Sequence, residues 1–148
     1  MYLKINQRIR HFAWFFFIAR KDGDFMRMEA IQSDCIRKMR SAMSLTKADI
    51  DAMMPSVIST YYTGQPLVYE RTGTLMTAGK TEGVNGGGMS CSMSAYMDKG
   101  TEWNTGTWSG SQIIDATNAG VLVGSGGYWD RIMQNAIMIA DAHFSSVF

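Results

Sequence analysis

The sequence predicts an α+β fold with N-terminal helices, a small and mostly antiparallel sheet bearing a long Gly/Trp loop, and a C-terminal amphipathic helix. Two observations lead to this fold class. Apolar residues recur at three- and four-residue spacing near both ends of the chain, which is typical of helices. Between them, residues 89–97 alternate strictly between apolar side chains and Ser or Tyr, which is typical of a strand with one buried face.

Length and composition indicate one folded domain. The chain has 148 residues, of which 46% are hydrophobic, and a chain of this size can bury a substantial core. We predict a single domain over residues 25–148, preceded by an aromatic and basic extension over residues 1–24.

The extension carries an almost unbroken aromatic run. Large exposed apolar patches mark contact sites, so Phe12, Trp14, Phe15 and Phe16 are candidate contact residues. Packing on the chain's own domain, docking on another subunit, membrane attachment and a poorly ordered extension all remain open. The apolar segment 11–19 is too short to span a bilayer core of about 30 Å.

The first helix is predicted over residues 25–43. Charged residues such as Arg27, Arg37 and Arg40 fall largely outside its apolar face. The residues of the apolar face recur at three- and four-residue spacing, as in a helix. They are Met28, Ile31, Cys35, Met39 and Ala42.

A second helix is predicted to begin at Lys47. Thr46 has the side chain of an N-cap, and Asp49 follows at the spacing of a capping box. Pro55 is compatible only with a position near the end of this helix or with a kink. Gly64 and Pro66 then act as stop signals.

The middle of the chain is predicted to form the sheet. Residues 89–97 form one strand, residues 75–81 form its partner, and the Asn-Gly-Gly-Gly segment at 85–88 supplies the turn between them. Residues 98–112 are predicted to form a loop. A loop of this length with two tryptophans favours a contact role for Trp103 and Trp108.

The last part of the chain begins with two short apolar runs, at 113–114 and 121–123, of which the second is typical of a strand. A C-terminal helix follows, with one continuous apolar stripe. The stripe comprises Trp129, Ile132, Met133, Ala136, Ile137, Ala140, His143 and Phe144.

Charge is unevenly distributed along the chain. Residues 1–47 contain ten Lys and Arg against four Asp and Glu, whereas the remainder contains four bases and nine acids. Such asymmetry indicates a nucleic-acid or membrane contact, a basic end that meets the acidic body of a neighbouring subunit, or simply a solvated helix face.

Catalytic and metal-binding patterns do not emerge from the sequence. The two cysteines form no CxxC pair, and the glycine-rich segments lack the residues of a phosphate-binding loop. His143 lies on an apolar stripe, where a packed and hydrogen-bonded role is the commoner one, and Cys91 is expected to be a small buried residue. We therefore expect no enzyme, no catalytic residues, no metal and no cofactor.

One short motif resembles a known family. The segment Tyr69–Leu75, "YERTGTL", is similar to the Tyr-x-Arg-Thr-Gly-x-Leu motif of the tail-completion, or neck, proteins of long-tailed bacteriophages, which include head–tail joining and minor tail proteins. The order of helices, motif, strand pair, Gly/Trp loop and terminal helix over residues 25–148 also resembles that family. The residues after Leu75 depart from its pattern, which usually has Ser or Asn there.

The resemblance implies a structural virion protein that forms a homo-oligomeric ring, commonly of six copies, at the neck. Its implied partners are a head-closure or connector protein and a tail-terminator or tail-tube protein, with non-specific contact to double-stranded DNA in the channel. It also implies assembly in the host cytoplasm, localisation in the virion and no membrane association. The motif's interface candidates are Tyr69, Glu70, Arg71, Thr72, Gly73 and Leu75.

Physical chemistry gives these motif residues distinct roles. Gly73 is free to adopt positive φ at a tight corner, after which Leu75 is expected to enter the sheet. Arg71 can bind a carboxylate or backbone carbonyls, within its own subunit or across a subunit boundary.

Two further functions remain open. One is a minor capsid or tail-terminator protein of the same particle. The other is a small nucleic-acid-binding or membrane-surface protein, for which the basic and aromatic N-terminal part supplies phosphate contacts and base stacking.

Overall fold

The computed structural model describes residues 1–8, 25–62, 73–87, 90–101, 103, 107–121 and 124–147. Helices and an antiparallel sheet confirm the predicted α+β class. The elements in chain order are β1 (Tyr2–Arg8), α2 (Phe25–Ser59), α3 (Thr74–Thr77), β2 (Gly79–Gly87), β3 (Ser90–Met97), α4 (Gly110–Asn118) and α5 (Tyr128–Ser145).

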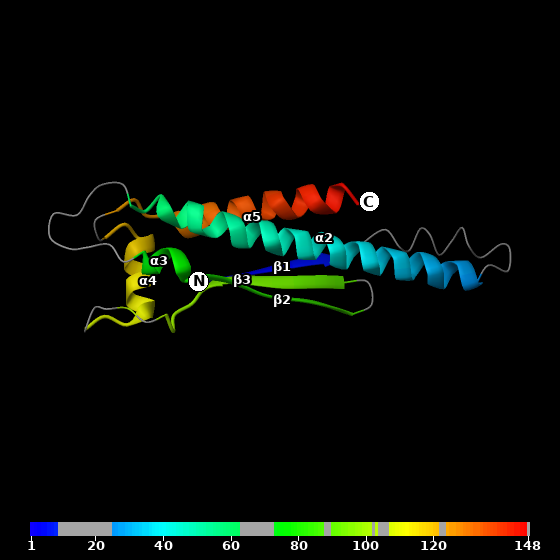
Figure 1. The fold of residues 1–148 in the computed structure, drawn as a ribbon, viewed down its shortest axis with the longest axis horizontal. Coiled ribbons are helices and arrows are strands. Elements are labelled where there is room, and N and C mark those ends of the chain that lie inside the picture. Colours follow the sequence, from blue (N-terminus) through cyan, green and yellow to red (C-terminus); the bar gives the residue numbers. More distant parts are fainter. Residues whose placement is uncertain are drawn as a thin grey trace.

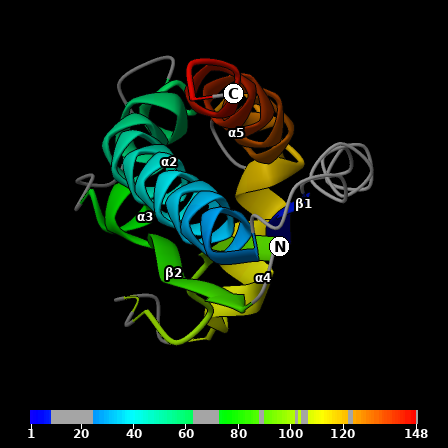
Figure 2. The same cartoon turned by 90° about the vertical axis from the view of Figure 1, so that its right-hand side faces the viewer.

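The two long helices form one layer and the sheet forms the other. α2 and α5 lie side by side along one face of the sheet (Figure 1 and Figure 2). The N-terminal part of α2 extends beyond both the sheet and α5 (Figure 1). Side chains from both helices and from the strands meet in a single core, whose largest fully buried members include Met43, Ile50, Met93, Ile114 and Tyr128.

The sheet has the strand order β1-β3-β2, and both strand pairs are antiparallel. The predicted alternation along β3 is confirmed, because Cys91, Met93, Ala95 and Met97 are all buried. The glycine-rich end of β2 adjoins the start of β3, and β2 continues to Gly87, so residues 85–87 of the predicted turn belong to the strand. Residues 88–89 lie outside the described part.

Residues 2–8 belong to the domain, which corrects the predicted boundary at residue 24. β1 pairs with β3 over its whole length, and Ile5 is buried opposite Met93. The apolar side chains at positions 3 and 5 alternate with polar neighbours, so the segment can cover the core with one face and meet water with the other. The remaining residues of the predicted extension, 9–24, lie outside the described part.

α2 is one continuous helix, so the predicted helix start at Thr46 is wrong. Thr46 is buried inside α2, and its hydroxyl donates a hydrogen bond to the Ala42 carbonyl oxygen at 2.9 Å. This bond to the carbonyl four residues earlier satisfies the hydroxyl within a helix. Pro55 lies four residues before the end of α2, as expected for a proline in this position.

The predicted strand over residues 75–81 begins late, at Gly79. Gly73 has φ 72°, which confirms the expected corner, but the chain then makes the single helical turn α3 instead of entering the sheet. The start of β2 lies directly beneath α2. A Cβ at position 79 would be 2.7 Å from the Met54 methyl carbon, so the missing side chain permits this close approach.

The predicted loop over residues 98–112 ends sooner than expected, because α4 begins at Gly110. The Ser109 side chain accepts from the Gln112 backbone N–H, and the Gln112 side chain accepts from the Ser109 backbone N–H. This reciprocal capping box stabilises the helix start. Val121 is exposed and in no strand, so the predicted strand at 121–123 is not found there, and residues 122–123 lie outside the described part.

α5 confirms the predicted C-terminal helix, but its buried stripe is narrower than predicted. Trp129, Ile132, Ala136 and Ala140 are buried, whereas Ile137 is exposed. The same narrowing occurs at the N-terminal end of α2, where Ile31 is exposed. Each helix therefore carries exposed apolar side chains in addition to its buried ones.

Tyr128 joins α5 to α4 inside the core. Its hydroxyl lies 3.1 Å from both the Ile114 carbonyl oxygen and the Thr117 hydroxyl, and its ring packs edge-to-face against Tyr61. Burial raises the pKa of Tyr128 to about 12, because the phenolate is poorly solvated there.

Tyr128→Phe is expected to lower the free energy of unfolding by about 1–3 kcal/mol at neutral pH, since it leaves buried hydrogen-bonding groups without this partner. The raised pKa of Tyr128 stabilises the protein fully below the ordinary tyrosine value of about 10. This contribution is lost as pH rises towards 12. Urea unfolding at pH 7 and pH 11 measures both effects. The difference in stability between the parent and Tyr128→Phe should shrink at the higher pH; an unchanged difference would contradict the assignment.

Candidate interaction surfaces

Four of the twelve candidate residues from the sequence lie in the described part of the structure. They are Gly73, Leu75, Trp103 and Trp108. The other eight lie outside the described residues, and their predicted contact roles stay predictions. These eight are Phe12, Trp14, Phe15, Phe16, Tyr69, Glu70, Arg71 and Thr72.

Leu75 is a core residue, which corrects its placement among the interface candidates. It is buried in α3 and belongs to the same apolar cluster as Met54 and Ile58 of α2. Gly73 is the N-cap of α3 in the left-handed conformation, and the Met76 backbone N–H donates to the Gly73 carbonyl at 2.9 Å. These two residues of the motif therefore shape the fold.

The two tryptophans of the loop differ in environment. Trp103 is half-buried and packs against the core, and its indole nitrogen Nε1 is buried. A Cβ at Gly110 would lie 2.2 Å from the Lys99 carbonyl oxygen and 2.9 Å from Trp103 Nε1, so the loop closes tightly on the start of α4. Trp108 keeps 46% of its surface exposed, and of the two it is the better contact candidate.

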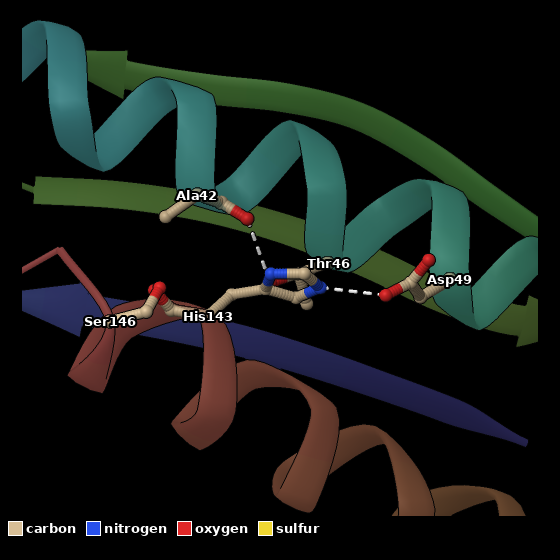
Figure 3. Close-up of polar contacts among 5 residues, drawn as sticks. All are labelled: Ala42, Thr46, Asp49, His143 and Ser146. Carbon is tan, nitrogen blue, oxygen red and sulfur yellow. Dashed lines mark hydrogen bonds and ion pairs between the residues drawn. The ribbon is translucent and has the colours of Figure 1, made fainter.

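His143 and Asp49 connect the two long helices (Figure 3). His143 Nε2 lies 2.7 Å from Asp49 Oδ2, which confirms that this histidine is packed and hydrogen-bonded. The neighbouring hydroxyls of Thr46 and Ser146 donate to the carbonyls of Ala42 and His143. Neither hydroxyl donates to the imidazole as a catalytic nucleophile would. The His143–Asp49 contact links α5 to α2.

Charged side chains also fix the long helix to its neighbours. Asp51 of α2 accepts hydrogen bonds from Lys47 and, at 2.5 Å, from the Thr81 hydroxyl of β2. Arg40 donates to the Gly86 carbonyl at 2.9 Å, and Arg131 of α5 donates to the Thr60 hydroxyl at 2.8 Å. These contacts hold α2 against both the sheet and α5.

Cysteine and metal chemistry receive no support from the described residues. Cys91 is buried in β3, and burial raises the pKa of its thiol, which disfavours the reactive thiolate. Within the ranges that the structure describes, no three His, Cys, Asp or Glu side chains come close enough together to hold a metal ion.

Several large apolar side chains of the two long helices are exposed. Ile31 and Leu45 of α2 are 43% and 52% exposed, and Ile137 and Met138 of α5 are 52% and 62% exposed. Ile31 and Leu45 are two heptads apart and therefore share a helix face. The same spacing is present in the sequence, but Leu45 falls in the segment with the pattern of a helix start, which obscures this face.

The comparisons with known proteins identify no relative. No family model matches the chain, no curated protein matches it, and no solved structure matches it. Among the described helices, none is both long enough and apolar enough to cross a membrane.

Proposed function

We propose that this chain is a structural subunit that assembles with copies of itself through the outer sides of α2 and α5. The observation that carries the proposal is the set of exposed apolar side chains on these two helices, Ile31, Leu45, Ile137 and Met138. Single exposed apolar residues are ordinary, but several on one layer favour a contact surface.

The dimensions of α2 suit such a role. Its 35 residues correspond to about 52 Å of helix, at about 1.5 Å per residue. Its N-terminal part extends past the rest of the molecule (Figure 1). A stable interface requires about 800 Å² from each partner, and a projecting helix can supply that area without rearrangement of the core.

Charges favour a contact between unlike surfaces. Asp130 and Asp141 are exposed on α5, whereas Arg37 and Lys38 are exposed on α2, beside their own partner Asp34. Opposite signs steer the α2 surface of one copy towards the α5 surface of another. A head-to-tail contact of this kind closes into a ring when the rotation between copies permits it.

The resemblance of Tyr69–Leu75 to the phage neck motif gives this assembly its proposed place. The subunit would form the ring between the head-closure region and the tail of a long-tailed phage, leaving a channel for DNA. The order of a long helix, a strand pair and an aromatic-initiated C-terminal helix agrees with that proposal.

Static light scattering of the purified full chain tests the assembly. We expect a species whose mass is a small whole multiple of 16.5 kDa, and electron microscopy of that species should show closed rings with a central opening. An interface of ~8 kcal/mol has a Kd of about 1 µM, so it should be nearly saturated at about 100 µM. A chain that keeps the mass of a single subunit at that concentration would overturn the proposal.

A further inference from the structure

The face of the sheet turned away from the helices carries polar and aromatic side chains. The strand register sets Tyr2 of β1, Tyr96 of β3 and Lys80 of β2 in one row, and sets Lys4, Ser94 and Glu82 in the next. Tyr2, Lys4, Lys80 and Glu82 are exposed, and the β3 residues between them are half-buried. α2 contacts β2 and β3 through their other face.

Hydrogen bonds hold both tyrosines of this face in position. The Tyr2 hydroxyl is 2.5 Å from the Ser94 hydroxyl, and the Tyr96 hydroxyl donates to Glu82 Oε1 at 2.8 Å. The bond to Glu82 raises the pKa of Tyr96 above its ordinary value. Both rings are thus tied at their hydroxyl ends to the neighbouring row.

We propose that this face binds single-stranded nucleic acid, with the rings of Tyr2 and Tyr96 as the stacking platform and Lys4 and Lys80 as phosphate contacts. Aromatic rings beside lysines on an open sheet are the features that single strands use, because unpaired bases stack on rings while the backbone follows positive charge. The chemistry is common to DNA and RNA single strands.

The arrangement favours a single strand over a duplex. The bases of a duplex are already stacked and paired, so a ring on a flat surface cannot insert between them without unstacking. Two carboxylates lie near these rings: Glu82, on the second row, and Asp98, whose charge acts on Tyr96 from the end of β3. Both repel phosphate, and Glu82 can accept a hydrogen bond from an exocyclic amino group of a base. This inference uses the sheet, whereas the proposed assembly uses the opposite, helical layer.

Fluorescence anisotropy of end-labelled oligonucleotides of about 12 residues, titrated with the full chain at low salt, tests the proposal. The probes are a single-stranded DNA, an RNA of the same sequence and the corresponding DNA duplex. We expect both single strands, or one of them, to bind at least ~5-fold more tightly than the duplex, because loss of one stacked base costs roughly that factor or more.

Variants locate the binding surface. Tyr2→Ala should weaken single-strand binding by roughly 5- to 150-fold, whereas Tyr2→Phe keeps the ring and should bind like the parent. Lys4→Ala with Lys80→Ala should lower the dependence of log affinity on log salt by about 1.4, since each lost phosphate contact contributes about 0.7 for single strands.

A matched control removes two cations from a different surface. Arg40→Ala with Lys47→Ala changes the net charge equally, and both side chains lie on α2 away from this face and from the residues of the proposed assembly surface, so binding should change little. Thermal unfolding by circular dichroism identifies any variant that fails to fold. An equal loss in the control, equal binding by Tyr2→Ala and Tyr2→Phe, tighter binding to duplex, or no binding by the parent at low salt would each overturn the proposal.

Discussion

Replacing Ile132 with alanine is expected to lower the free energy of unfolding by about 2–5 kcal/mol, the range for removing a large aliphatic side chain from a packed core. Ile132 is completely buried in α5 and belongs to the cluster that joins the long helices to the sheet. The core cluster that contains Ile132 draws side chains from both helices and strands, which cannot all move to fill the space, so most of the cavity cost remains.

Ile137→Ala is the matched control for this prediction. The residue type, the substitution and the helix are the same, but the Ile137 side chain is more than half exposed. Its expected effect is within about 0.5 kcal/mol, because alanine favours helices and little buried area is lost. Urea denaturation of both variants, at dilutions where assembly does not contribute, measures the difference. Equal losses would mean that α5 is rotated about its axis relative to the orientation described above.

The same pair of residues shows the limit of helical periodicity as a predictor. Ile132 and Ile137 both fall on an apolar stripe of the sequence, and the stripe alone does not tell how much of it the core covers. The width of the buried part of the stripe depends on how α2 and the sheet pack against α5. Apolar residues at the edges of the stripe are left outside, and these are the residues on which an interaction surface can be built.

Strand β3 could be predicted because its signal is local and has one structural explanation. Alternation of buried and half-buried side chains fixes both the strand and the face that it presents to the core. β1 carries a similar alternation at Leu3 and Ile5, yet its partner lies about ninety residues away in the sequence. Nothing near residues 2–8 indicates that partner, so the segment was assigned to an extension.

Thr46 and Ser109 show how one pattern can have two outcomes. Both are hydroxyl residues with a polar residue three positions later, yet Thr46 lies inside a helix and Ser109 begins one. Around Thr46, the buried residues Met43 and Ile50 continue the apolar face through the site, so core packing favours an uninterrupted helix. Ser109 follows Thr107 and Trp108, which lie in no helix, so its capping box can form at the start of α4.

The open sheet face was missed for a different reason. Tyr2, Lys4, Lys80 and Tyr96 come from three separate segments and become neighbours only through strand pairing. In the sequence, basic residues are concentrated in the first 47 positions and the aromatic run also lies there. Strand pairing places only Tyr2 and Lys4 of that part on this face, beside Lys80 and Tyr96 from the middle of the chain.

Met138→Lys is expected to weaken self-association by at least about 30-fold, the effect of losing a contact worth about 2 kcal/mol. Among the apolar side chains that the structure describes on the two long helices, that of Met138 is the most exposed, with 62% of its surface accessible. Lysine removes its apolar area and presents a positive charge to Arg37 and Lys38 of the approaching copy, where like charges disfavour docking. The fold should be retained, because an exposed helix position tolerates lysine.

Val121→Lys provides the control, since it too replaces an exposed apolar residue with a cation but lies outside the helical layer. Light scattering over a dilution series, with circular dichroism to confirm folding, should show assembly of the parent and of Val121→Lys at concentrations where Met138→Lys is a single subunit. Assembly of all three alike would remove α5 from the interface. Loss of assembly in both variants would indicate a non-specific response to added charge, since the helical layer then has no special part in association.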